Sequence, residues 1–128
     1  MNFQLKLFNW QDQGNHLIVL ARGCMEKTSF RKLFDEIVTA TQGLTQCKVL
    51  VDVSDSTYAI DSVEIESLVA DLPLDRWGPA NRIAFVSASE RADYYRLYFL
   101  RTGLVAHGIT AGVFYDSKIA INWLAGII

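Results

Sequence analysis

Three stretches of the 128-residue sequence are apolar at nearly every position. They are CKVLVDV (47–53), RIAFVS (82–87) and AGVFYD (111–116). A strand that faces water on one side alternates apolar and polar residues, whereas a strand covered on both sides does not. Because helices supply that double cover in parallel sheets, the three stretches predict an α/β protein with a largely parallel sheet.

The segments around these strands complete the pattern. Residues 3–8 alternate apolar and polar side chains and predict an outer strand, and residues 16–22 predict its hairpin partner. Thr28 or Ser29 is expected to cap the first helix, and further helical patterns cover about residues 62–72, 89–107 and 117–125. We therefore expect one domain over residues 1–128, with a single-layer mixed, mostly parallel five-stranded sheet and four helices in the order ββαβαβαβα.

Charge and composition exclude several classes of protein. The formal charge of −2 argues against a nucleic-acid partner, which needs clustered excess Lys and Arg. Two cysteines are too few for a disulfide framework, and the N-terminus lacks the pattern of a signal peptide. No apolar run approaches the roughly 20 residues that span a bilayer. The chain is therefore expected to be a soluble cytoplasmic protein without a transmembrane segment.

No motif for catalysis or cofactor binding stands out. The sequence lacks a Gly-rich phosphate loop, a G-x-S-x-G elbow and a C-x-x-C pair. His16 and His107 fall on different elements, and no spaced His, Cys, Asp and Glu set predicts a metal site. We therefore expect no enzyme activity, no cofactor and no metal.

Polar residues recur where the predicted strands end. The set comprises Asp52, Ser54, Asp55, Ser87, Ser89, Asp116 and Ser117. The carboxyl ends of parallel strands share one edge of the sheet, where α/β proteins often bind ligands. A polar ligand could bind there, but helix capping by these Ser and Asp side chains is the favoured interpretation.

The helix predicted over residues 89–107 is apolar around most of its circumference. One stripe consists of Ala92, Tyr95, Phe99, Gly103 and Ala106, and a second of Tyr94, Leu97, Tyr98, Arg101, Leu104 and Val105. A surface helix buries a single stripe. Small residues suit close approach to the sheet, so the first stripe is predicted to face the sheet and the second to face outward.

The outward stripe, together with Trp77, is the candidate interface. Tyr, Trp and Arg beside Leu are typical of interface cores, and a symmetric homodimer is the commonest way to cover such a surface. Other occupants are a regulatory protein partner, a membrane surface, or an apolar ligand or lipid held between this helix and its neighbour. Alternatively, the loop over residues 73–81 covers the stripe with Trp77.

Two longer stretches resemble a known family. KVLVDVSDSTYAIDS is similar to the strand, loop and Asp-Ser pair of bacterial anti-sigma-factor antagonists. RIAFVSASERADYYRLYFLRTG, followed by VFYDSKIAINWL, resembles small uncharacterised bacterial STAS-like (SpoIIAA-like) proteins, which end in an A-x-x-W-L helix, here Ala120, Trp123 and Leu124. The resemblance implies the STAS fold and a regulatory role in an unknown pathway. It does not point to a particular activity, because most of these proteins have none assigned.

The same resemblance makes Ser62 a candidate phosphoacceptor. In the antagonists an Asp-Ser-Ser-Gly motif carries the phosphorylated serine, and Asp61-Ser62 match its first two residues. Val63 and Glu64 stand where the second Ser and the Gly belong. The favoured interpretation is that Ser62 or Asp61 caps the helix that follows. The expected function is therefore a non-enzymatic interaction module, homodimeric through residues 89–107, with a phosphorylation switch or apolar-ligand binding as alternatives.

Overall fold

The computed structural model describes residues 2–10, 14–44, 46–88 and 91–126. The elements are β1 (Asn2–Trp10), β2 (Gly14–Met25), α1 (Lys27–Thr41), β3 (Lys48–Asp52), β4 (Ser56–Tyr58), α2 (Ser62–Asp71), the 3₁₀ turn η1 (Leu74–Arg76), β5 (Arg82–Val86), α3 (Arg91–Ala106), β6 (Thr110–Phe114) and α4 (Ser117–Leu124). The mixed α/β fold predicted from the sequence is confirmed. The predicted strand count of five was wrong, because β4 adds a sixth strand to the described sheet.

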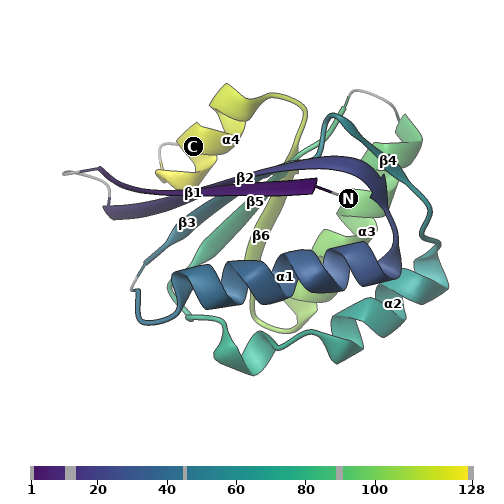
Figure 1. The fold of residues 1–128 in the computed structure, drawn as a ribbon, viewed down its shortest axis with the longest axis horizontal. Helices are drawn as coiled ribbons and strands as arrows, with labels where there is room; N and C mark the ends of the chain where they lie inside the picture. The colour runs from purple at the N-terminus through teal and green to yellow at the C-terminus, as the bar shows by residue number, and fades with distance from the viewer. Residues whose placement is uncertain (1, 11–13, 45, 89–90, 127–128) are drawn as a thin grey trace.

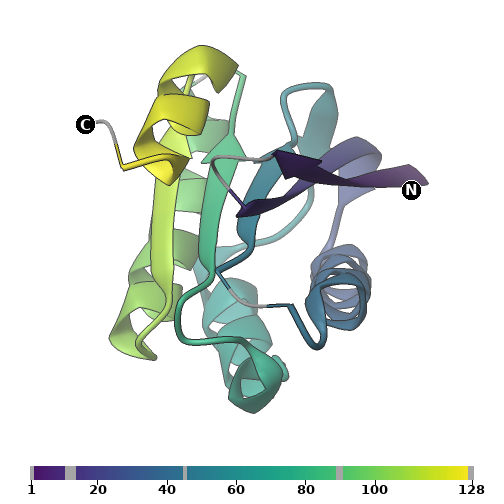
Figure 2. The same ribbon diagram turned by 90° about the vertical axis from the view of Figure 1, so that its left-hand side faces the viewer.

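The main path through the sheet runs β1-β2-β3-β5-β6. β1 is antiparallel to β2, every later pair on the path is parallel, and β4 pairs with the last residues of β2. Each parallel strand is added on the same side of its predecessor, so right-handed crossovers place α1, α2 and α3 on one face of the sheet (Figure 1). α4 returns across the opposite face, as Figure 2 shows. Among the described strands the order never reverses, so the fold has no switch-point crevice of the doubly wound type.

Both faces of the central strands are buried, as their apolar sequences predicted. On the face of α1, α2 and α3, the core includes Ile83 and Phe85 of β5, both without solvent exposure. On the other face, Ala120 and Leu124 of α4 pack with a cluster that includes Ala84. α1, α2 and α3 on one face and α4 on the other thus cover both sides of these strands, as strands without alternating polar residues require.

The start of α1 differs from the prediction. Glu26 is the N-terminal cap residue, and Ser29 instead donates its hydroxyl hydrogen bond to the carbonyl oxygen of Cys24 at 3.2 Å. The cause is the length of β2, whose residues 23–25 stay in the sheet by pairing with β4. The chain therefore leaves the sheet only after Met25 and enters the helix at once, before Thr28 can act as a cap.

Candidate functional site

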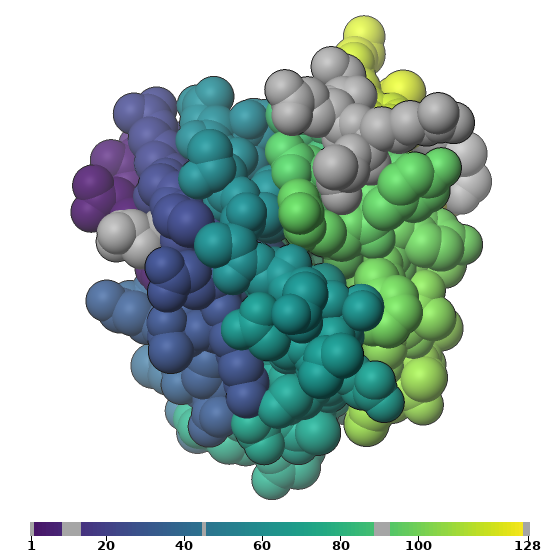
Figure 3. All heavy atoms as spheres, turned by 90° about the vertical axis from the view of Figure 1, so that its right-hand side faces the viewer, coloured from purple at the N-terminus to yellow at the C-terminus, as the bar shows by residue number. Residues whose placement is uncertain are grey.

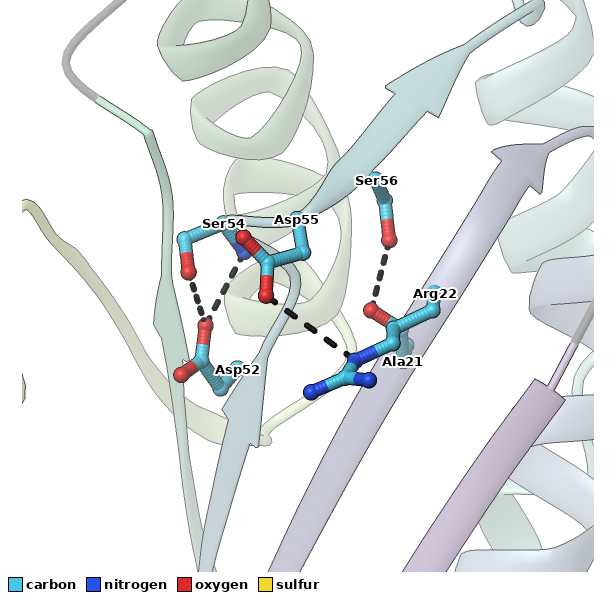
Figure 4. A network of polar contacts seen from close by, with 6 residues as sticks. All are labelled: Ala21, Arg22, Asp52, Ser54, Asp55 and Ser56. Carbon is cyan, nitrogen blue, oxygen red and sulfur yellow. Dashed lines mark hydrogen bonds and ion pairs between the residues drawn. The ribbon is translucent and has the colours of Figure 1, made fainter.

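The polar residues after β3 hold a turn together. The Oδ1 atom of Asp52 accepts hydrogen bonds from the backbone N–H of Ser54 at 2.9 Å and from its hydroxyl at 2.5 Å. The hydroxyl of Ser56 donates to the carbonyl oxygen of Ala21 at 2.8 Å, which ties the loop to β2 (Figure 4). The prediction that Asp52 and Ser54 cap a helix was wrong, because the short strand β4 follows β3 before any helix begins.

The other strand ends are also used by the fold itself. Asp116 caps α4 by accepting from the backbone N–H groups of Lys118 and Ile119, at 2.7 and 3.2 Å, and Ser87 donates to the carbonyl oxygen of Ala88. Ser89 lies outside the described residues. Within the described ranges, no group of three or more His, Cys, Asp or Glu side chains could hold a metal ion. This edge of the sheet therefore offers turns and caps rather than a preformed ligand site.

Burial raises the pKa of two side chains and keeps both protonated near neutral pH. The pKa of Cys47 rises to about 11 because the thiol is buried, although a backbone hydrogen bond with Leu17 partly opposes the rise. The pKa of Tyr58 lies well above its usual range because of burial and, next, because of the nearby negative charge of Asp93. A thiol or phenol that stays protonated is a poor nucleophile or base.

Asp61, rather than Ser62, caps α2. The Oδ1 atom of Asp61 accepts from the backbone N–H of Glu64 at 2.8 Å, and Oε1 of Glu64 accepts from the backbone N–H of Asp61 at 3.2 Å. This reciprocal pair is a capping box. Ser62 is the first helical residue, and its side chain is exposed. Glu64, which departs from the antagonists' pattern, thus has a structural role of its own.

The orientation of α3 differs from the prediction. The predicted interface residues Leu97 and Leu104 are fully buried, whereas Tyr95 and Phe99, expected against the sheet, are exposed. Gly103 approaches α2 rather than the sheet, since a Cβ atom built there would lie 3.0 Å from Cγ2 of Val69. The leucine side of the helix therefore faces inward, because leucine gains more from burial than tyrosine does.

The six residues of 93–106 that are exposed as whole residues are all uncharged. We call this set the outward face of α3, and it consists of Tyr95, Tyr98, Phe99, Thr102, Val105 and Ala106. The charged residues of the same segment have partners within the protein, although the side chain of Arg96 is 40% exposed beside this face. Asp93 pairs with Arg96 at 3.2 Å, and Arg101 donates from Nε to the carbonyl oxygen of Ala111 at 3.2 Å. A surface helix normally shows the opposite arrangement, with polar residues outward.

Further aromatic rings extend this surface beyond β6. Tyr94, which is partly buried, stacks on Tyr115 with 4.5 Å between ring centroids and also lies 6.2 Å from Tyr98. The guanidinium group of Arg101 lies over the ring of Tyr98 at 5.5 Å. Of the predicted interface residues, Tyr94, Tyr98, Arg101 and Val105 thus retain surface exposure. Stacked rings of this kind hold their positions and form a rigid contact surface.

Trp77 does not belong to this surface. Its side chain is only 8% exposed and packs in the main core, so its assignment to the interface was wrong. The turn η1 and the hydrogen bond from the backbone N–H of Asn81 to the carbonyl oxygen of Gly78 fold the loop back over the core and carry Trp77 inward. The neighbouring Arg82 donates from its guanidinium group to the carbonyl oxygen of Trp123 at 3.1 Å.

Two adjoining hollows lie between α2 and α3. Their volumes are about 520 and 490 Å³, and Ile65 and Phe99 line both. Ser62 and Arg96 line the first hollow, and His107 lines the second. Figure 3 shows α2, in teal, between α1 in blue and α3 in green on this side of the molecule. The sequence suggested a groove beside α3, but only the packing of the two helices locates it.

Comparisons with known proteins identify the fold. No family model and no curated protein matches the chain. Among solved structures, the chain is similar to an uncharacterized protein of the DUF3478 family from Shewanella loihica PV-4, which is described as having a SpoIIAA-like fold. The two chains share 16% identity over 95% of this chain and 93% of the other, with a TM-score of 0.58. None of the described helices has both the length and the apolar character needed to cross a bilayer. The fold that the sequence resemblance implied is confirmed: the chain adopts the SpoIIAA-like fold.

Proposed function

We propose that the protein is a non-enzymatic interaction module that forms a homodimer through the outward face of α3. The observation that carries this proposal is the outward face of α3 itself, a set of exposed residues that are uncharged and include three aromatic rings. Interface cores are depleted of charge and enriched in aromatic residues, as this face is. A contact centred on this face would remove aromatic surface from water, with the ion pair of Arg96 and Asp93 beside it.

The exposed aromatic rings would supply about half of a standard contact. Tyr95, Tyr98, Phe99 and Tyr115 are 57%, 46%, 44% and 53% exposed. With about 200 Å² for each whole side chain, the four rings present about 400 Å² to solvent. A standard interface buries about 800 Å² on each partner, so these rings alone supply about half of it. Thr102, Val105 and Ala106 adjoin them and add to that area.

The buried ionisable groups and the strand ends support a role without catalysis. Cys47 and Tyr58 are held in their protonated forms, and the polar side chains after β3 and β6 are engaged in turns and caps. The features that would prepare a nucleophile or a base are therefore not built from these residues. The outward face of α3, by contrast, gathers Tyr95, Tyr98, Phe99 and Val105 as exposed large apolar side chains on one helix.

Light scattering coupled to gel filtration tests the proposal. The wild-type protein should elute with twice the mass of the 14.4 kDa chain. Tyr98→Glu should give a monomer with an unchanged circular dichroism spectrum, because it places a charge in the contact. Thr39→Glu, at an exposed position of α1, is the matched control and should remain a dimer. A wild-type protein that stays monomeric up to millimolar concentration would refute the homodimer.

The hollows between α2 and α3 favour a second candidate function, the binding of an apolar small molecule. Ile65, Val69 and Phe99 line them, and Arg96 stands in the first hollow. Dodecanoic acid is a suitable probe, because its chain can lie along the apolar surface with its carboxylate toward Arg96. Nuclear magnetic resonance should show saturable shifts at Ile65 and Val69. Unchanged spectra at millimolar probe would remove this candidate.

The position of Ser62 leaves a third candidate, a phosphorylation switch. Its exposed side chain lines the same hollow as Arg96, whose positive charge favours a phosphate. Asp61 and Glu64 line that hollow too and oppose a phosphate by repulsion. Mass spectrometry of protein purified from its native cells should find phosphoserine in the peptide containing Ser62. Its absence across growth conditions would reject the switch.

A further inference from the structure

Four of the six residues of the outward face of α3 follow the spacing of a helix–helix seam. Tyr95, Phe99, Thr102 and Ala106 are all exposed and are separated by four, three and four residues. This alternation of three and four keeps side chains on one line of a helix, and it lets two helices pack along their length at a small angle. The seam covers 12 residues, or about 17 Å of helix.

The sizes of these side chains differ between the two halves of the seam. Tyr95 and Phe99 are bulky and lie toward the N-terminal end, whereas Thr102 and Ala106 are small and lie toward the C-terminal end. Two helices that run in the same direction would bring ring against ring at one end and methyl against methyl at the other. That arrangement would leave a gap beside Ala106, and unfilled space costs free energy.

We infer that two copies of the chain pair α3 against α3 in antiparallel orientation, about a twofold axis that passes between Phe99 and Thr102. This inference rests on the proposed homodimer and adds its geometry. Tyr95 then lies opposite Ala106 of the second copy, and Phe99 lies opposite its Thr102. Each ring fills the space above a small residue, and the same match occurs twice because the axis repeats it.

The seam residues carry no charge, and the charged residues nearest to them lie at its side. Asp61, Glu64 and Arg96 line the hollow that Tyr95 and Phe99 also line. Asp93 and Arg96 stay paired within each copy, and Arg101 stays on the carbonyl oxygen of Ala111. Within the seam itself, the sizes of the residues therefore favour one direction of pairing over the other.

Cysteine cross-linking tests the antiparallel register. The exposed Cys24 is first replaced in Cys24→Ser, and the buried Cys47 is retained. Tyr95→Cys and Ala106→Cys are then made separately in this background. In the antiparallel dimer, the new cysteine of one subunit lies about 16 Å along the helix from the same cysteine in the other subunit, which is beyond the reach of a disulfide. Neither variant should cross-link alone under mild oxidation, whereas an equimolar mixture of the two should.

The outcomes separate the register from the proposed function. Self-cross-linking of each variant would overturn the antiparallel register and leave the homodimer standing, since parallel helices bring identical residues together. Absence of every cross-link in a protein that light scattering shows to be dimeric would overturn both the register and the use of α3. A monomer would overturn the homodimer and, with it, the register.

A size exchange gives an independent measurement. Tyr95→Ala and Ala106→Tyr should each raise the dimer dissociation constant by about tenfold or more, as losses at interface anchors do. The double variant should recover most of the wild-type affinity, because the large and small residues have traded places across the antiparallel contact. Circular dichroism checks that each variant is folded. Affinity losses that simply add in the double variant would contradict the register.

Discussion

Leu97 and Tyr98 are neighbours in the sequence but face opposite environments, and their replacement by Ala tests the orientation of α3. Leu97 is fully buried in the main core, and Tyr98 is 46% exposed. A Leu→Ala change at a buried site costs the transfer of the lost methyl groups and leaves a cavity, together about 3 kcal/mol. With an unfolding entropy of about 0.27 kcal/mol/K for a chain of this length, that loss lowers Tm by about 11 °C.

Tyr98→Ala is the matched control and should behave differently. Its ring contacts Tyr94 and Arg101 but is 46% exposed, so the free energy of unfolding of the monomer should fall by about 1 kcal/mol, less than for Leu97→Ala. If the protein is dimeric, a further loss should appear at high protein concentration, because dimerisation stabilises the folded state by mass action. Urea unfolding followed by circular dichroism, at two concentrations fifty-fold apart, separates the two effects. The loss in Leu97→Ala should be equal at both concentrations.

A large loss in Tyr98→Ala at the lower concentration would refute this reasoning. Adjacent residues are separated by about 100° around a helix, so comparable losses would mean that α3 is rotated by about half that angle or more. Tyr98 would then belong to the core. The outward face of α3 would then lose Tyr98, and the proposed dimer would lose its main support.

Three further changes test other parts of the structure. Asp61→Ala should lower the free energy of unfolding by about 1 kcal/mol through loss of the capping box, and Ser62→Ala by less than about 0.5 kcal/mol, in urea titrations. A thiol reagent should modify Cys24 in the native protein and Cys47 only after unfolding. Because burial raises the pKa of Cys47 from 9.0 to about 11, the buried neutral thiol should contribute less and less to the free energy of unfolding as the pH rises between those values. Gly112→Ala should destabilise by about 1 to 3 kcal/mol, because its Cβ would lie 2.8 Å from an aromatic ring of β6; calorimetry measures the loss.

The sheet was predictable because burial on both faces leaves a direct mark on the sequence. Val49, Ile83 and Ala111 stand in strands without polar alternation, and each is buried in the structure. No such apolar pattern predicted β4. Its three residues, Ser56–Tyr58, form a strand only because the turn held by Asp52 brings them beside the end of β2. That pairing joins residues more than 30 positions apart, which local patterns do not reveal.

The orientation of α3 could not be settled by periodicity alone. Two stripes of the helix are apolar, and the choice between them was made by assigning small residues to the sheet. The structure shows that Gly103 instead gives Val69 of α2 room to approach. A different comparison within the sequence would have favoured the correct face, since Leu97, Leu100 and Leu104 share one side and leucine is buried more often than tyrosine.

The topology explains why the aromatic surface lies on α3. The crossovers place α1, α2 and α3 in one row, with α2 in contact with both neighbours and α3 at the end beside the outer strand β6. The helix that follows, α4, crosses to the other face of the sheet, so it does not extend the row (Figure 2). An exposed outer strand can also recruit a second sheet, but Arg101 occupies the carbonyl oxygen of Ala111 on β6. The proposed dimer therefore uses the outward face of α3 and leaves the edge of β6, where Arg101 already holds one carbonyl oxygen, outside the contact.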